Sequence, residues 1–273
     1  AGVPFTPSQW RGADAPSVRN GFRAHYLALH FDNFYQAAPI LEVQRYIEDI
    51  ALWGVNTIIT ILPGPGTMPA GDSGTVAPDE PQIPVAVNRT RLVLQHAVGI
   101  GISAGVVLQA NLGYDSGTFH HHTGKSPVPY TPFPDPLHVR GTSGALTCAA
   151  KGTDYLLEMR RHGFGQLADL PLEWIVSWPY DTGGCGCSED WPWGGRGYPR
   201  LSSALATLAR HIFPDIKMIL ATWCFDKPLD SAGSEYALLD KYIKAETSAA
   251  RARGSKLSSN FTFVMVDEHG DFP

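Results

Sequence analysis

Acidic residues follow three apolar runs in the second half of the chain, and they are the residues best suited to chemistry: Asp181, Asp226, and Asp267 with Glu268. Hydrolysis of a glycosidic bond needs two carboxyl groups, roughly 5 to 9.5 Å apart. A single acidic residue in a loop more often caps a helix or pairs with an arginine. Three such positions in succession favour a shared pocket, so we expect Asp181, Asp267 and Glu268 to be catalytic.

Aromatic residues gather around these acids in the sequence. Aromatic faces pack on the apolar faces of sugar rings, while indole N–H and phenol O–H groups reach hydroxyls. Some of these rings are expected to pack in the core, but a glycine-rich loop offers little core to fill, which favours Trp191 and Trp193 as ligand contacts. The residues expected to bind substrate from this half of the chain are Tyr180, Trp191, Trp193, Trp223 and Asp226, and His30 and His120 could bind sugar hydroxyls from earlier strand ends.

A metal site is a competing explanation for part of this region. Cys185 and Cys187, with His121 in the run of histidines at 120–122, carry zinc-ligand side chains. A single C-x-C without a second paired motif is a weak zinc signal, and adjacent histidines do not easily share one ion. We therefore expect no cofactor, with zinc as the alternative. The four cysteines leave both a secreted and a cytoplasmic location open.

Six runs rich in β-branched and aromatic residues alternate with helical stretches, at 25–30, 57–62, 104–108, 174–178, 218–221 and 261–266. Their nearly continuous apolar character is typical of parallel strands that are covered on both faces. Apolar residues at helical spacing predict amphipathic helices near 40–54, 201–212 and 236–243. The pattern predicts an α/β fold, a TIM-type (β/α) barrel with the acids at its mouth. A doubly wound sheet ranks second, because no G-x-G-x-x-G follows an early strand.

Composition and length bound the remaining possibilities. The 273 residues, 44% of them hydrophobic, predict one catalytic domain over 1–273. A formal net charge of −5 gives no basic stripe for nucleic acid, and no apolar run is long enough to span a membrane. Six strand–helix units fall short of the eight of a closed barrel. We expect a fragment of a longer protein, an irregular closure, or a partner chain that covers the open edge.

Four stretches resemble the catalytic barrel of family 20 type β-hexosaminidases and their uncharacterised relatives: RAHYL at 23–27, LWGVNT at 52–57, WPYD at 178–181 and GGCGC at 183–187. The resemblance implies that Arg23 binds hydroxyls of the terminal sugar. The family's Asp-Glu pair would fall on Asp181 and Thr182, so the Glu is absent here. Acids after the fourth and sixth strands instead resemble α-galactosidase type barrels, which implies Asp181 as nucleophile and Asp267 as acid/base.

The sequence thus predicts a glycoside hydrolase. Long Gly- and Pro-rich connections at 63–84 and 114–142 would close the pocket at one end, which favours a terminal sugar of an oligo- or polysaccharide as substrate. Two alternatives stay open. One is a catalytically silent carbohydrate-binding barrel, and the other is a metal-dependent enzyme that uses the Cys and His ligands.

Overall fold

The computed structural model describes residues 21–29, 33–63, 82–111, 149–179, 187–222, 225, 228–229, 233–252 and 263–265. Its centre is a six-stranded sheet in which every neighbouring pair is parallel. The strands follow the order β1 (Ala24–Leu27), β2 (Thr57–Ile61), β3 (Ser103–Gln109), β4 (Leu172–Trp178), β5 (Lys217–Ala221) and β8 (Phe263–Met265). A separate two-stranded antiparallel pair joins β6 (Pro228–Leu229) to β7 (Gly233–Ser234). The predicted parallel sheet is confirmed.

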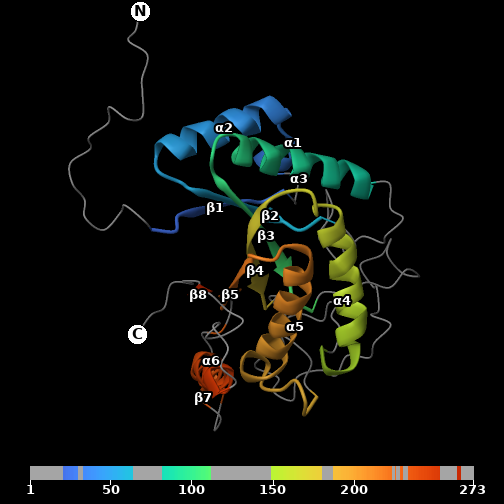
Figure 1. Cartoon of the computed structure of the whole chain (residues 1–273), viewed down its shortest axis with the longest axis vertical. Coiled ribbons are helices and arrows are strands. Elements are labelled where there is room, and N and C mark those ends of the chain that lie inside the picture. Colours follow the sequence, from blue (N-terminus) through green and yellow to red (C-terminus); the bar gives the residue numbers. More distant parts are fainter. Residues whose placement is uncertain are drawn as a thin grey trace, which may run out of the picture.

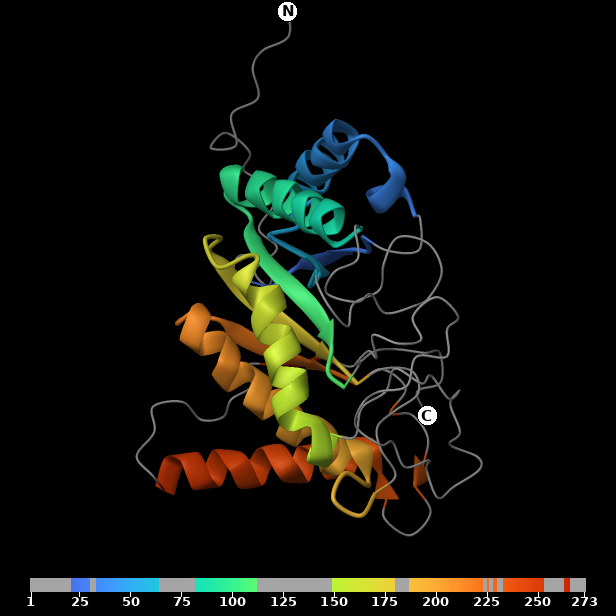
Figure 2. The ribbon, with the colours of Figure 1, turned by 90° about the vertical axis from the view of Figure 1, so that its right-hand side faces the viewer.

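Helices separate successive strands of this sheet (Figure 1). They are α1 (Phe34–Ala37), α2 (Ile40–Leu52), α3 (Gln82–Gly99), α4 (Ala149–Gly165), α5 (Gly197–Ile212) and α6 (Glu235–Ala252), with a 3-10 turn η4 (Trp193–Gly195) before α5. Figures 1 and 2 show α2 beside α3 and α4 beside α5, each pair along the outside of the strands. Among the helices that the structure describes, none combines the length and the apolar character that crossing a membrane requires.

The strand order distinguishes the two predicted architectures. A doubly wound sheet reverses its strand order at a switch point. Here each strand of the sheet is hydrogen-bonded to the next one along the chain, without a reversal. Because crossovers between parallel strands are right-handed, an unreversed order places all helices on one face. The architecture is therefore of the (β/α) barrel type, with six of the eight strands of a complete barrel in the described residues.

Two aromatic contacts across the inner face show that the sheet curls. The Tyr26 and Trp178 rings lie with centroids 5.2 Å apart, and the Phe22 and Trp174 rings lie 4.3 Å apart. Tyr26 is on β1 and Trp178 on β4, three places along the sheet, which is about 14 Å at the usual spacing between strands. A flat sheet would hold these rings apart, so β1 and β4 must approach each other across a concave face, as in a barrel.

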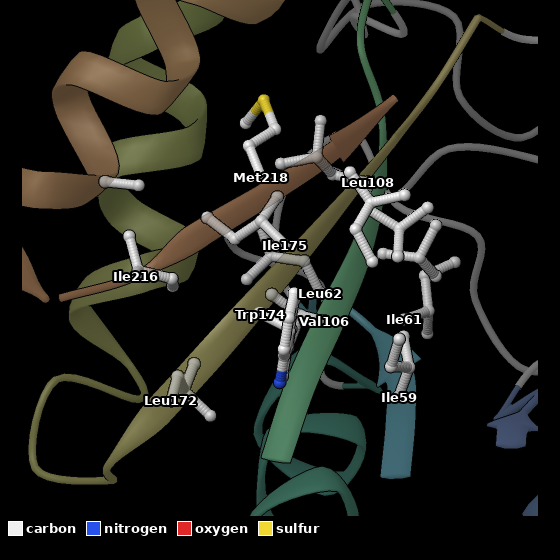
Figure 3. Packing of buried hydrophobic residues seen from close by; sticks show 14 of the residues in the cluster. Ile59, Ile61, Leu62, Val106, Leu108, Leu172, Trp174, Ile175, Ile216 and Met218 are labelled. Atoms are coloured by element: carbon white, nitrogen blue, oxygen red, sulfur yellow. The ribbon is translucent and has the colours of Figure 1, made fainter. Parts of the chain in front are cut away.

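The strands are buried on both faces, which explains their nearly unbroken apolar sequences. All five residues of β2 are buried. Figure 3 shows side chains from β2 to β5 following one another across the sheet, among them Ile61, Leu108, Ile175 and Met218. Gly105 on β3 leaves room for this packing, because a Cβ there would lie 2.7 Å from Trp174 Cβ.

Local chemistry explains where the predicted helix 40–54 begins and ends. Pro39 precedes α2, and Val43 and Ile47 are its buried residues. The chain leaves the helix at Gly54, whose φ of 93° is one that other residues rarely adopt. The next connection is shorter than expected, since α3 begins at Gln82 and takes in Pro84, which the first turn of a helix tolerates.

Candidate functional site

The C-terminal ends of four strands lie side by side, as the register of the sheet shows. Gln109 at the end of β3 is paired with Trp178 at the end of β4. Ser177 is paired with Leu220 on β5, and Ala221 at the end of β5 is paired with Met265 at the end of β8. In barrels of this type the active site lies at this end of the sheet. We call this end of the sheet, formed by the C-terminal ends of β3, β4, β5 and β8, the mouth.

The register also assigns side chains to the two faces of the sheet. Residues paired in parallel strands point to the same face, and neighbours along a strand point to opposite faces. Tyr26 and Trp178, which touch across the concave side, mark the inner face. Gln109, the partner of Trp178, shares that face. Ser177 points outward, where its hydroxyl lies 2.8 Å from that of Ser202 on α5.

Gln109 and Trp178 bring buried polar atoms to the mouth. The side chain of Gln109 is 7% exposed. Its Oε1 and the Nε1 of Trp178 are hidden from solvent, and neither has a hydrogen-bond partner among the described residues. Buried polar groups in folded proteins are nearly always hydrogen-bonded, so these two atoms on one face at adjacent strand ends are available to a bound ligand or a water molecule.

Arg160 on α4 holds the C-terminal end of β3 by a hydrogen bond. The residue is 1% exposed, and its guanidinium donates from Nη2 to the backbone carbonyl of Gln109 at 2.7 Å. Burial lowers the pKa of Arg160 to about 10, so it stays charged at neutral pH. The end of β3 is held further by the Ala110 N–H, which donates to the Trp178 carbonyl at 2.9 Å.

Tyr198 on α5 holds the ends of β4 and β5 together. Its ring is fully buried, and its hydroxyl donates to the carbonyl of Ser177 and lies 2.8 Å from the carbonyl of Ala221. Burial raises the pKa of this phenol well above its ordinary value, so it remains a donor throughout the neutral range. Tyr198 therefore sets the spacing of two strands that lead to acidic residues.

The acid-rich stretch after β4 contributes one carboxylate that has a structural role. Asp190 is fully buried and accepts a hydrogen bond from the Ala150 N–H at the start of α4, at 3.1 Å. The guanidinium of Arg200 on α5 lies 2.5 Å from its other oxygen. Asp190 thus connects the beginnings of two helices, as acids near helix N-termini often do.

Trp193 lies in the core. Its side chain is 1% exposed, its indole N–H donates to the Pro179 carbonyl at 3.1 Å, and a Cβ on Gly197 would approach its ring to 2.5 Å. The premise that a glycine-rich loop leaves its tryptophans little core to fill does not hold for Trp193, because the missing Cβ of Gly197 allows close packing against its ring. Trp191, the other expected contact in this loop, is half-buried.

Arg23 lies away from the mouth. It directly precedes β1, and its guanidinium donates to the carbonyl of Gly54, in the turn before β2. Both positions are at the N-terminal ends of their strands. The structure therefore does not bring Arg23 together with the strand ends that lead to the acids, although the family resemblance implies that it binds sugar.

The remaining predicted site residues lie outside the described residues: His30, His120, His121, Tyr180, Asp181, Cys185, Trp223, Asp226, Asp267 and Glu268. Cys187 is described and half-buried, and its carbonyl accepts from the Trp191 N–H at 2.8 Å. Within the described part of the chain, no three His, Cys, Asp or Glu residues are grouped so that they could hold a metal ion.

Sequence reasoning did not single out Gln109, Tyr26 or Arg160. One signal for Gln109 was present, since it is a polar residue that ends the apolar run VVL at 106–108. No sequence signal connects Tyr26 with Trp178, because their contact depends on the curl of the sheet.

Comparisons with known proteins give structural likeness only. Neither the models of protein families nor the curated proteins yield a match to this sequence. Solved structures that resemble the chain include the α-amylase of Geobacillus thermoleovorans in complex with acarbose, at 13% identity and a TM-score of 0.47, covering 75% of this chain and 47% of that one. A glycoside hydrolase family 20 β-N-acetylglucosaminidase matches at 11% identity and a TM-score of 0.49, covering 90% and 52%.

A GH10 endoxylanase from a sugarcane soil metagenome matches at 14% identity and a TM-score of 0.45, covering 91% of this chain and 58% of that one. The chain spans about half the length of the first two of these structures. The TM-scores of all three are below 0.5, so the barrel-type fold rests on the strand order and curl of this chain itself.

Proposed function

We propose that this protein is a glycoside hydrolase that acts on a terminal sugar at the mouth of the sheet. The observation that supports it best is the adjacency of β4, β5 and β8. Each of these three strands leads within a few residues to an acid, namely Asp181, Asp226 and Asp267. Parallel strands direct these chain segments toward the same end of the sheet.

The spacing of the strands suits a pair of catalytic carboxylates. One strand separates β4 from β8, so their backbones are about 10 Å apart. Asp181 follows the described Pro179 by two residues, and Asp267 follows Met265 by two residues. Two residues of chain reach at most about 7 Å. Carboxyl groups on these segments can therefore attain the roughly 5 to 9.5 Å that glycoside hydrolysis uses.

In this proposal Asp181 is the nucleophile and Asp267 the general acid/base. If β8 continued beyond Met265, Asp267 and Glu268 would point to opposite faces, so only one of them can face the sugar directly. Asp226, Tyr180, Trp191, Trp223, His30 and His120 are the proposed contacts to sugar hydroxyls and ring faces. The proposed reaction needs no cofactor.

Hydrolysis of a panel of nitrophenyl glycosides tests the proposal. The protein should release nitrophenol from at least one of them, and Asp181→Asn should reduce kcat/KM about 100-fold or more with the fold retained. Asp267→Asn and Glu268→Gln are compared in the same way, and the variant with the larger loss of kcat/KM identifies the acid/base. Asp215→Asn is the matched control, since Asp215 is exposed and lies two residues before β5, at the other end of the sheet.

Failure to hydrolyse any glycoside, with binding of sugars retained, would favour a catalytically silent carbohydrate-binding barrel. Activity that survives in Asp181→Asn would overturn the assignment of the nucleophile. Activity that a chelator removes and added zinc restores would favour the metal-dependent alternative with Cys185, Cys187 and His121.

A further inference from the structure

The mouth holds a hydrogen-bond acceptor and a donor at paired positions of adjacent strands. Gln109 and Trp178 are register partners at the ends of β3 and β4. Oε1 of Gln109 accepts hydrogen bonds and Nε1–H of Trp178 donates them. Neither atom has a partner within the described residues, and the two are not bonded to each other. A group that both donates and accepts would satisfy both atoms.

The Trp178 ring and the backbone of both residues are held in place. The Trp178 ring rests edge-to-face on Tyr26, with centroids 5.2 Å apart and an interplanar angle of 75°. Arg160 and the Ala110 N–H fix the backbone carbonyls of Gln109 and Trp178, at 2.7 and 2.9 Å. A packed indole donor beside an acceptor on an anchored strand end is characteristic of binding sites that recognise ligands by hydrogen bonds.

We propose that Gln109 and Trp178 form a sugar subsite that binds hydroxyl groups of an uncharged pyranose ring. The Trp178 Nε1–H donates to one hydroxyl oxygen, and a hydroxyl of the same ring donates to Gln109 Oε1. Both side chains are uncharged, so the pair matches a neutral, hydroxyl-rich ring better than a phosphate or carboxylate. The choice of a sugar rests on the proposed function, but the subsite itself needs no catalytic carboxylate.

Binding and catalysis are measured separately, so that the subsite and the hydrolase proposal can fail independently. Saturation-transfer NMR and calorimetry follow the binding of methyl glycosides of glucose, galactose, mannose, xylose and N-acetylglucosamine to the purified protein. Trp178→Phe keeps an aromatic ring and removes only the N–H. Gln109→Leu keeps the approximate shape and removes the acceptor. Each variant should raise the Kd about 10-fold or more for the glycoside that binds best.

Trp174→Phe is the matched control. Trp174 is on the same strand and face as Trp178, four residues earlier, and its ring lies against Phe22 at the opposite end of the sheet. The control should leave the Kd unchanged, and circular dichroism with thermal melts should show that all three variants are folded. Gln109→Asn keeps an amide oxygen as acceptor, so it should bind the glycoside more tightly than Gln109→Leu does.

Each outcome decides one of the two proposals. Binding that weakens in both variants supports the subsite even if no glycoside is hydrolysed, and in that case only the hydrolase proposal fails. Hydrolysis whose KM stays the same in Trp178→Phe and Gln109→Leu overturns the subsite and leaves the hydrolase proposal standing. Failure of the unaltered protein to bind any of the five methyl glycosides also overturns the subsite.

Discussion

Tyr26 and Trp178 touch across the inner face of the sheet, although their strands stand three places apart. The Phe22 and Trp174 pair repeats the contact nearer the N-terminal ends of the strands. The two pairs join β1 and β4 on the concave side of the sheet. The Tyr26 and Trp178 pair lies beside the buried polar atoms at the mouth, Gln109 Oε1 and Trp178 Nε1. Trp178 therefore takes part both in the curvature of the sheet and in the candidate site.

A double-mutant cycle on Tyr26 and Trp178 measures this contact. We expect Tyr26→Leu and Trp178→Leu to couple by about 0.5–1.5 kcal/mol in the free energy of unfolding, because aromatic pairs contribute about that much beyond their buried area. Urea denaturation supplies the four free energies. Trp53, which is 89% exposed at the end of α2, provides the control pair Tyr26→Leu with Trp53→Leu. Additive effects in the Tyr26 and Trp178 cycle would show that the sheet does not curl in this way.

Gly105→Ala should destabilise the protein by about 1–3 kcal/mol, the usual cost of overpacking a core. The reason is steric, since the added Cβ would meet Trp174 Cβ at 2.7 Å and its carbonyl oxygen at 2.8 Å. Gly99→Ala is the matched control, because nothing lies within 4 Å of a Cβ at that position, the last residue of α3. Thermal unfolding compares the two, and a neutral Gly105→Ala would contradict the packing of β3 against β4.

Asp190→Ala should reduce the free energy of unfolding by about 1–3 kcal/mol. The substitution removes the acceptor of the Ala150 N–H and the partner of Arg200, and the amide left without its acceptor accounts for the cost. Asp190→Asn should recover part of the loss, because it keeps an acceptor oxygen. Glu189→Gln, at the exposed neighbour, should change stability by less than about 0.5 kcal/mol. Equal effects at positions 189 and 190 would argue against this role.

Tyr198 should make the protein less stable at alkaline pH. Burial raises its pKa above the ordinary value of 10.0. Below pH 10 the phenol is protonated in both the folded and the unfolded chain, so stability does not depend on its titration. Above about pH 10 only the unfolded chain loses this proton, and stability falls as the pH rises.

Tyr198→Phe separates this titration from the loss of the hydroxyl. At pH 8 the variant should be about 1 kcal/mol less stable, because the carbonyls of Ser177 and Ala221 lose a donor. From about pH 10 upward its stability should fall less steeply than that of the unaltered protein, as followed by urea denaturation at several pH values. Identical slopes would show that Tyr198 titrates as freely in the folded protein as in the unfolded chain.

The predicted strands and helices were largely confirmed because their signals are local. Helix α2 ends close to the predicted boundary, where a glycine can adopt the positive φ of the turn. The core strands were predicted from continuous apolar runs, and their burial on both faces is the physical cause of those runs. The boundary of the first strand was less accurate, since β1 ends at Leu27 instead of residue 30.

The roles of individual side chains depended on contacts that the sequence does not display. Trp193 packs in the core because the missing Cβ of Gly197 admits its ring, and Arg23 lies at the N-terminal end of β1, away from the strand ends that lead to the acids. Asp181, Asp267 and Glu268 remain predictions, since they are outside the described residues.

The sequence by itself determined the alternation of strands and helices and the place of the acids after β4, β5 and β8, because periodicity and chain order are properties of neighbouring residues. Only the tertiary structure decided that the strands keep their chain order, that β1 curls toward β4, and that Gln109 and Trp178 stand side by side at the mouth. Those relationships arise from packing between residues far apart in the chain. No local sequence pattern encodes which of these distant residues will come into contact.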